Sequence, residues 1–384
     1  MIQKRLAIQC GRLLQKDGTY TKEQTVLTEN NKILEIADGY VTPENFRILN
    51  AKEKWVTPGL IESHGHSATM DDTNEMGSNP NPIMPYLTIR DSINPKDKQI
   101  SVIRGGGFTT CCVLPGSATL INGTGLAIKM KNADTVDEIE ISECQPLKLA
   151  LGDNPKMMPR GIAPTSRMGN AALIRKAFYE VKSKLKNRGY DSAAADTWQE
   201  IPMMEALEGK RLVKIHCHDP RDIVTAVHLA EEFGWDYTLE HVTGGYHVAD
   251  FLREHHVRCC VGPLFINPLK YELRAVDPSN PARLEKAGVE FSLIEDACWD
   301  TNTLQLPSLA GICTAYGLSR EAAMRGLTIE AAKNLHLEKR IGSVEIGKDA
   351  DLAIFNGDPL LNTTRCDITI LDGVVYENRK EAVR

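Results

Sequence analysis

The sequence predicts an α/β protein, a (β/α)8 TIM-like barrel with a small β-sandwich formed by the N- and C-terminal segments. In the centre of the chain, short β-branched runs alternate with amphipathic helical patterns. Both ends of the chain contain short strand-like runs that are separated by turns. Strands that alternate with helices indicate a parallel sheet, and this number of repeats favours a (β/α)8 barrel over an open sheet.

The sandwich domain is expected from residues 1–55 together with residues 340–384. A chain of 384 residues is longer than one small core usually serves, so a large domain with a smaller one is expected. Turn residues such as Gly357-Asp358-Pro359 and Asp372-Gly373 interrupt the terminal runs. The strands predicted there are Arg5–Leu14, Gln24–Glu29, Lys32–Ile36, Asn45–Leu49, Asp351–Phe355 and Asp367–Tyr376.

The barrel is expected from residues 56–339. Besides the apolar run that begins at Val56, the predicted strands are Phe108–Leu114, Leu147–Leu151, Leu212–His216, Tyr237–Val242, Val257–Gly262 and Val289–Ile294. The amphipathic segments predicted to form helices include Ala171–Lys186, Asp222–Phe233, Ala249–His255 and Arg320–Leu327. In such barrels the chemistry lies at the carboxyl ends of the strands, so residues that end or follow a strand are the candidates for a site.

Composition and charge narrow the class of function. Hydrophobic residues make up 42% of the chain and charged residues 25%, as in an ordinary soluble enzyme. The net charge is −6 without a basic block, which argues against a nucleic acid or an anionic membrane as partner. No apolar run is long enough to span a bilayer, and Met1–Leu6 lacks the features of a signal peptide. The 10 cysteines lie in apolar segments, so we expect buried, reduced thiols in a cytoplasmic protein.

Two histidines end the first apolar run of the centre. The segment Val56–His66 closes with His64-Gly65-His66. Side chains at positions i and i+2 of a strand leave the same face, so His64 and His66 are expected to point the same way. Two neutral imidazoles at a strand end make half of a metal site, although so short a pair also occurs by chance in loops.

Further ligand-type residues stand at the ends of other predicted strands. They are His216 and His218, His241, and Asp296. A single histidine at a strand end is more often a hydrogen-bonded structural residue than a ligand. Four strand ends with this chemistry are better explained by one metal site, because a combined motif is far more specific than its parts.

With these motifs the chain resembles members of the amidohydrolase superfamily, in the branch related to imidazolonepropionase. The resemblance covers nearly the whole chain, and its tail motif marks the small β-sandwich of that superfamily. The matching segments are Val56–His66, Asp71–Glu75, Val113–Ser117, Leu151–Pro155, Ser166–Gly169, Ile215–His218, Leu239–His241, Glu295-Asp296 and the tail Ile341–Leu352. The resemblance implies a metal-dependent hydrolase and does not specify a substrate.

The resemblance also implies a set of ligands for one or two divalent metal ions. His64 and His66 would ligate from the first barrel strand, and His216 and His241 from the fifth and sixth. Asp296, on the eighth, would touch the metal and its water. Zn²⁺ is favoured by histidine and carboxylate ligation, although manganese, iron or cobalt would accept similar ligands.

In many relatives a carboxylated lysine or a glutamate on the fourth strand bridges two metals. Lys148 is the candidate here, and the alternative is a lysine at a strand edge that faces solvent. The chain departs from the family at Glu62, where an aspartate with a supporting role is usual. It departs again in Asp219–Asp222 and in Ala297-Cys298-Trp299, beside the expected pocket, and these changes concern the substrate more than the metal.

A site of this kind is expected to hydrolyse a C–N bond in a linear or cyclic amide of a small molecule. A divalent metal with an open position lowers the pKa of bound water from 15.7 to about 7. Asp296 would accept the proton of that water and deliver it to the leaving nitrogen. His218 shares the face of His216, and it would either bind substrate and stabilise the oxyanion or orient a ligand.

Two other functions compete with the hydrolase. A deaminase would direct the same chemistry at an amidine-like carbon. The second alternative is a catalytically inactive scaffold of the same fold, which assembles with itself or with a partner. The intact ligand set argues against this scaffold. A homo-oligomer is compatible with the sequence under any of the three.

Substrate contacts are expected from the long loop after the first strand, about residues 67–100. Loops of this length often serve as lids or binding loops. Asp71, Asn74 and Glu75 are candidates for the rim of the pocket, and solvated loop charges are the simpler explanation of each. Arg167 is a candidate clamp for a substrate carboxylate, with a surface arginine that caps a helix as the alternative.

Overall fold

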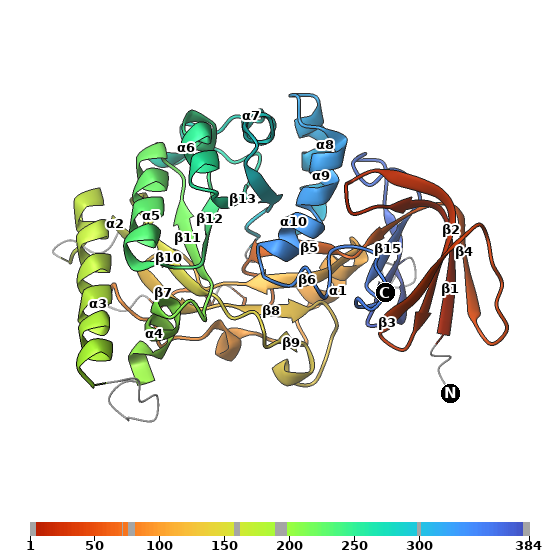
Figure 1. Cartoon of the computed structure of the whole chain (residues 1–384), viewed down its shortest axis with the longest axis horizontal. Helices are drawn as coiled ribbons and strands as arrows, with labels where there is room; N and C mark the ends of the chain where they lie inside the picture. The colour runs from red at the N-terminus through yellow and green to blue at the C-terminus, as the bar shows by residue number, and fades with distance from the viewer. Residues whose placement is uncertain are drawn as a thin grey trace.

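The structure is a computed structural model that describes residues 5–70, 72–75, 81–156, 162–188, 198–297 and 301–378. Figure 1 shows two regions side by side. At one end of the molecule, strands from the start of the chain (red) lie beside strands from its end (blue). The remainder consists of central strands with helices packed along their outer side. None of the described helices has the length and apolar character needed to cross a membrane.

The two ends of the chain build one seven-stranded sheet, in the order β17-β16-β15-β4-β1-β2-β3. Its strands are β1 (Arg5–Leu14), β2 (Tyr20–Glu29), β3 (Lys32–Asp38), β4 (Arg47–Pro58), β15 (Leu352–Phe355), β16 (Cys366–Leu371) and β17 (Val374–Glu377). Leu6, Ile8 and Cys10 alternate along β1 and belong to an apolar core of this sheet. All seven strands belong to one hydrogen-bonded sheet.

Strand β4 differs from the prediction in its length. The sequence predicts a short strand at Asn45–Leu49 and a separate run from Val56, whereas β4 continues without a break from Arg47 to Pro58. It pairs with β1 in parallel and with β15 in antiparallel orientation, so its second half is held by strands from both ends of the chain. The boundary expected at residue 55 therefore falls inside a strand.

The central strands form two further sheets. A six-stranded sheet has the order β14-β13-β12-β11-β10-β7, and a four-stranded sheet has the order β5-β6-β8-β9. These strands are β5 (Leu60–Gly65), β6 (Phe108–Val113), β7 (Ile121–Thr124), β8 (Leu126–Lys129), β9 (Glu140–Ile141), β10 (Leu147–Ala150), β11 (Val213–Cys217), β12 (Tyr237–His241), β13 (Arg258–Val261) and β14 (Glu290–Leu293).

The prediction of eight parallel strands is wrong in one part of these sheets. Every central run named from the sequence forms a strand, and β5 with β6 and β10 through β14 pair in parallel. However, β8 runs antiparallel to β6, and β7 runs antiparallel to β10. No helix lies between β6 and β8 in the chain, whereas a parallel neighbour usually requires a helical crossover of about a dozen residues or more.

The described residues contain no β-ladder between β14 and β5. Single hydrogen bonds link the two strands instead: the backbone N–H of His66 donates to the carbonyl of Ala297 at 2.8 Å, and the hydroxyls of Ser63 and Ser292 lie 2.8 Å apart. These bonds hold the ends of both strands at a fixed distance, which matters because both ends contribute residues to the site.

The helices lie mainly outside the six-stranded sheet (Figure 1). Helix α5 shows why such a segment forms. Its N-cap Asp219 accepts a hydrogen bond from the backbone of Arg221, Pro220 is its first residue, and Gly234 ends it with a φ of 69°. The described helices are α1 (Lys98–Gly105), α2 (Asp153–Lys156), α3 (Arg167–Arg188), α4 (Ile201–Leu207), α5 (Pro220–Phe233), α6 (Ala249–Glu254), α7 (Asn280–Ala287), α8 (Leu306–Thr314), α9 (Arg320–Gly326) and α10 (Ile329–Lys333).

A buried cluster of charges joins the central strands to the terminal sheet. Lys129 is the last residue of β8, and its side chain is 3% exposed. Its Nζ lies 2.7 Å from Asp349 and 2.5 Å from Asp351, which directly precedes β15. Lys32 and Arg340 also bond to Asp349, so side chains of the protein itself neutralise these carboxylates.

Replacing Lys129 with Met should lower the free energy of unfolding by about 3–5 kcal/mol, because it leaves buried carboxylates without their main partner. Urea unfolding followed by circular dichroism measures this change. Lys131→Met is the matched control, since Lys131 is 30% exposed and bonds to Asp372 at 3.0 Å. The control should cost less than about 1 kcal/mol, and equal losses in the two variants would contradict a special role of the buried pair.

Candidate metal centre

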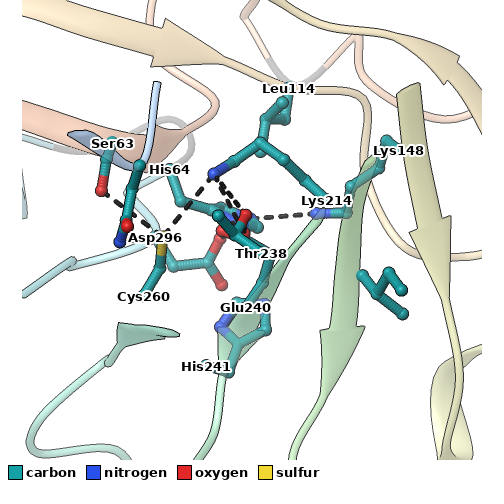
Figure 2. Close-up of polar contacts among 12 residues, drawn as sticks. Ser63, His64, Leu114, Lys148, Lys214, Thr238, Glu240, His241, Cys260 and Asp296 are labelled. Atoms are coloured by element: carbon teal, nitrogen blue, oxygen red, sulfur yellow. Dashed lines mark hydrogen bonds and ion pairs between the residues drawn. The ribbon is translucent and has the colours of Figure 1, made fainter. Parts of the chain in front are cut away.

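The residues predicted to ligate a metal lie at the carboxyl ends of the central strands. His64 belongs to β5, His216 to β11, His241 ends β12, and Asp296 follows β14. Figure 2 shows His64, His241 and Asp296 close together. The histidines that the sequence singles out, including His66 and His218, are all buried. The structure therefore brings to one place residues that are far apart in the chain.

Backbone carbonyls set the tautomers of two imidazoles. Nδ1 of His66 lies 2.7 Å from the carbonyl oxygen of Leu114, and Nδ1 of His241 lies 2.9 Å from that of Gly262. A carbonyl oxygen only accepts hydrogen bonds, so both Nδ1 atoms donate. In the neutral ring the lone pair is then on Nε2, which is the nitrogen available to a metal.

A carboxylate orients His64. Its Nδ1 lies 2.6 Å from Oε2 of Glu240, and both side chains are fully buried. Burial opposes the ionisation of Glu240, but Lys214 and the hydrogen bond from His64 outweigh it, so the pKa of Glu240 is far below its usual range. The ionised carboxylate accepts the Nδ1 proton and leaves Nε2 of His64 facing the site.

Asp296 lies where the Nε2 atoms converge. Its Oδ1 is 3.1 Å from Nε2 of His66 and 3.4 Å from Nε2 of His64. His64, His241 and Asp296 each offer a ligand atom within 4.8 Å of the other two. Burial opposes the ionisation of Asp296, so the pKa of this carboxyl falls well below its usual range only where positive charge at His241 and His66, or on a cation held by them, outweighs the burial.

A second group of ligand-type residues shares His241 with the first. His216, His218 and His241 offer ligand atoms within 4.8 Å of one another. The ring centroid of His241 is 4.4 Å from that of His216 and 4.6 Å from that of His218. Nδ1 of His218 is 2.8 Å from the hydroxyl of Thr243, which holds the ring in place. His241 is therefore the point at which the two groups join.

The residues of this centre fit a divalent cation. Nε2 of His241 and Nδ1 of His216 are buried and have no hydrogen-bond partner in the described part of the chain. Burial lowers the pKa of His218 and of His241 to about 3, so both rings are neutral and keep their lone pairs at neutral pH. Imidazole nitrogen and carboxylate oxygen form the usual donor set for zinc and related ions, and a cation there would satisfy polar atoms that are costly to bury alone.

Two residues of the centre have a left-handed backbone. The φ angles are 73° for His241 and 58° for Asp296, and Val242 follows with 46°. Residues other than glycine rarely adopt this region, at a cost on the order of 1–3 kcal/mol each. Because Glu240 points inward from β12, a regular strand would turn His241 outward. The left-handed backbone instead turns its ring toward the other histidines.

Lys148 points into the centre from β10. It is 0% exposed, and its Nζ lies 3.0 Å from Nε2 of His64. Burial lowers the pKa of Lys148 to about 8. The alternative of a lysine at a strand edge that faces solvent is therefore wrong, whereas carboxylation of Lys148 stays a prediction.

Glu62, which replaces the usual aspartate, has a supporting position. Its buried carboxylate accepts hydrogen bonds from the backbone N–H of His64 at 3.2 Å and of Glu295 at 3.1 Å. It thus ties the end of β5 to the segment that leads into Asp296. Burial raises the pKa of Glu62 well above its usual range.

The sequence did not point to several residues that complete the surroundings of the centre. Lys214 and Glu240 form a buried ion pair next to His64, and Lys270 reaches Asn154, whose amide lies 3.4 Å from Nε2 of His216. A signal for Lys214 existed: it precedes His216 by two residues on β11, so the two side chains share a face. No comparable local pattern marks the other contacts, because each joins distant segments.

The contacts of the predicted substrate-binding residues that the structure describes join them to residues other than the ligand candidates. Nε of Arg167 lies 2.9 Å from Asp222, and Nη2 lies 3.3 Å from Asp153. Asn74 is exposed and its side chain accepts a hydrogen bond from the backbone of Ala118, and Glu75 is exposed. Asp71 lies outside the described residues. Roles of these four residues in substrate binding stay predictions.

Known proteins resemble this chain in sequence and in structure. The amidohydrolase tasK of Hapsidospora irregularis is 27% identical over an alignment 356 residues long, which covers 83% of this chain and 36% of that protein. The chain thus spans about a third of the length of that relative. The imidazolonepropionase of Shewanella oneidensis is 46% identical over 44 residues, 12% of this chain and 11% of that enzyme, so support for this branch is confined to a short segment.

A crystal structure of an amidohydrolase from Thermotoga maritima MSB8 superposes with a TM-score of 0.88 at 29% identity. The alignment covers 97% of this chain and all of the other. The sequence model of the amidohydrolase family matches residues 55–378. This match includes every ligand candidate described above, and the chain therefore belongs to the amidohydrolase family.

Proposed function

We propose that this protein is a metal-dependent hydrolase that cleaves a C–N bond, in a linear or cyclic amide, of a small molecule. The main support is the convergence of buried histidine nitrogens on the carboxylate of Asp296. Membership of the amidohydrolase family supports the same chemistry. The loops around the centre would determine which amide is the substrate.

His64, His66, His216, His241 and Asp296 would hold the metal, and Zn²⁺ is the ion that these ligands favour. A divalent ion supplies Lewis-acid activation of water and of the scissile carbonyl. We also propose that Lys148 is carboxylated and bridges two ions. Its burial and its lowered pKa support this, because a neutral amine is the form that adds to carbon dioxide.

The residues of the chain would divide the remaining work. Beside a bound cation Asp296 would be ionised, and its side chain is 26% exposed, so it could accept a proton from water and deliver it to the leaving nitrogen. His218 is held by Thr243 and is the candidate for contact with substrate or for stabilisation of developing negative charge. His64 and His66, whose Nδ1 atoms are engaged, would keep the geometry fixed while the proton moves.

We propose in addition that the two central sheets together make the (β/α)8 barrel of residues 56–339. The hydrogen bonds between the ends of β5 and β14 support this, as does the similarity to the Thermotoga maritima amidohydrolase. The terminal sheet, from residues 1–55 and 340–384, would then be the small β-sandwich.

Replacing Asp296 with Asn should reduce turnover by a factor of about 10²–10⁴, because the amide cannot transfer the proton. The rate would be measured on a substrate found by screening N-acyl and cyclic amides, with the metal content determined in parallel. Asp236→Asn is the control, since its side chain is 47% exposed and only approaches His336. Full metal content with unchanged turnover in the Asp296 variant would refute the mechanism.

The same screen separates hydrolysis from deamination. A hydrolase produces a new carboxylate together with an amine, whereas a deaminase releases ammonia and leaves a carbonyl on the substrate.

Replacing Lys148 with Met should remove one metal ion per chain, if the natural protein binds two through a carboxylated lysine. Elemental analysis of the purified proteins measures the stoichiometry. Lys156→Met serves as control, because this lysine is partly exposed and bonds to Asp153 on α2. One ion per chain in the natural protein and in both variants would exclude the bridge.

A further inference from the structure

A fully buried ion pair lies next to the metal centre. Lys214 and Glu240 are both 0% exposed, and Nζ of Lys214 is 2.9 Å from Oε1 of Glu240. The hydroxyl of Thr238 donates to the same Oε1 at 2.5 Å and accepts from Lys214 at 3.1 Å. Figure 2 shows this group beside His64 and Asp296. Neither Lys214 nor Glu240 is a ligand candidate.

Packing does not explain this pair. The interior of a barrel of parallel strands is usually filled by branched apolar side chains. Moving two charges out of water is costly, and apolar residues of similar volume often stabilise a protein equally well or better. Lys214 lies two residues before His216, and Glu240 lies directly before His241. The pair therefore occupies a position from which it can act on the ligands.

The second oxygen of Glu240 shows what the pair acts on. Oε2 lies 2.6 Å from Nδ1 of His64. His66 and His241 bond through Nδ1 to backbone carbonyls, whose positions the strands and loops already fix. His64 has a side-chain carboxylate in that place, and a side chain is fixed only if other groups hold it. Lys214 and Thr238 both hold its other oxygen.

We propose that Glu240, held by Lys214 and Thr238, is a positioning residue that fixes the Nδ1–H tautomer and the orientation of His64 and thereby sets the metal affinity of the centre. The part that concerns affinity rests on the proposed function, because it requires that the centre binds a metal. The tautomer of His64 can be measured without a metal.

Two variants separate positioning from a purely structural ion pair. In Glu240→Gln, Lys214 should attract the amide oxygen, so that the amide N–H faces Nδ1 of His64 and forces the other tautomer. In Lys214→Met/Glu240→Leu the pair is replaced by apolar residues of similar size, which removes the buried charges together. Glu330→Gln is the matched control, because Glu330 pairs with Arg258 at 2.9 Å and contacts none of the ligand candidates.

The first measurement is Zn²⁺ affinity by competition with a chelator, alongside urea unfolding of the metal-free proteins. Glu240→Gln and the double variant should bind Zn²⁺ about 10–100-fold more weakly than the natural protein and the Glu330→Gln control. The affinity loss should persist in the double variant even where its stability equals that of the natural protein. Natural affinity in a stable double variant would overturn the proposal.

The second measurement is the nitrogen NMR spectrum of the histidines in the metal-free proteins, with His64 assigned from the signal lost in His64→Gln. The natural protein should show His64 protonated at Nδ1, and Glu240→Gln should show it protonated at Nε2. An unchanged His64 tautomer in Glu240→Gln would refute the positioning role. If the natural protein binds none of Zn²⁺, Mn²⁺, Fe²⁺ and Co²⁺ while the tautomer still shifts, the proposed hydrolase function fails and the positioning of His64 by Glu240 stands.

Discussion

The candidate site depends on the hydrogen bonds that engage the Nδ1 atoms of its histidines. His66 and His241 donate to backbone carbonyls, and His64 donates to a buried carboxylate. Once Nδ1 is a donor, the lone pair of the neutral ring lies on Nε2. The Nε2 atoms of His64 and His66 then face Asp296. The groups that accept from Nδ1 therefore determine which way the ligand atoms point.

Charges inside this protein follow two different patterns. Lys129 lies among carboxylates at the junction with the terminal sheet, and Lys214 lies against Glu240. In both places each charge has its partner, as burial in a low dielectric requires. At the metal centre the polar groups are not all paired in this way. Lys148 contacts an imidazole, and two ring nitrogens have no partner among the described residues. Locally incomplete bonding inside an otherwise satisfied structure is typical of a functional site.

The strained backbone belongs to the same pattern. His241 ends one parallel strand and Asp296 follows another, and both have left-handed φ angles where the chain leaves the sheet. The surrounding sheet supplies the stability that such conformations require. Strand ends are therefore suitable places for ligands, because rigid neighbours hold a residue there in a conformation that the isolated chain would avoid.

The sequence by itself determined most of the strands, although not β7, β8 and β9. It also identified His64, His66, His216, His241 and Asp296 as a set of ligand candidates. Period-two patterns and the residues at strand ends are local properties, and local properties can be read along the chain. The sequence did not predict β7 and β8 or their antiparallel direction, because counting alternating strands and helices assumes a helix between neighbouring strands.

Only the tertiary structure decided that Lys148 is buried against His64, that Glu240 binds Nδ1 of the same ring, and that Arg167 lies among carboxylates. Each of these contacts joins segments tens to hundreds of residues apart. Whether a lysine in a strand meets solvent or an imidazole depends on which strand becomes its neighbour. The neighbour of each strand depends on the packing of the whole chain, so no local sequence pattern predicts it.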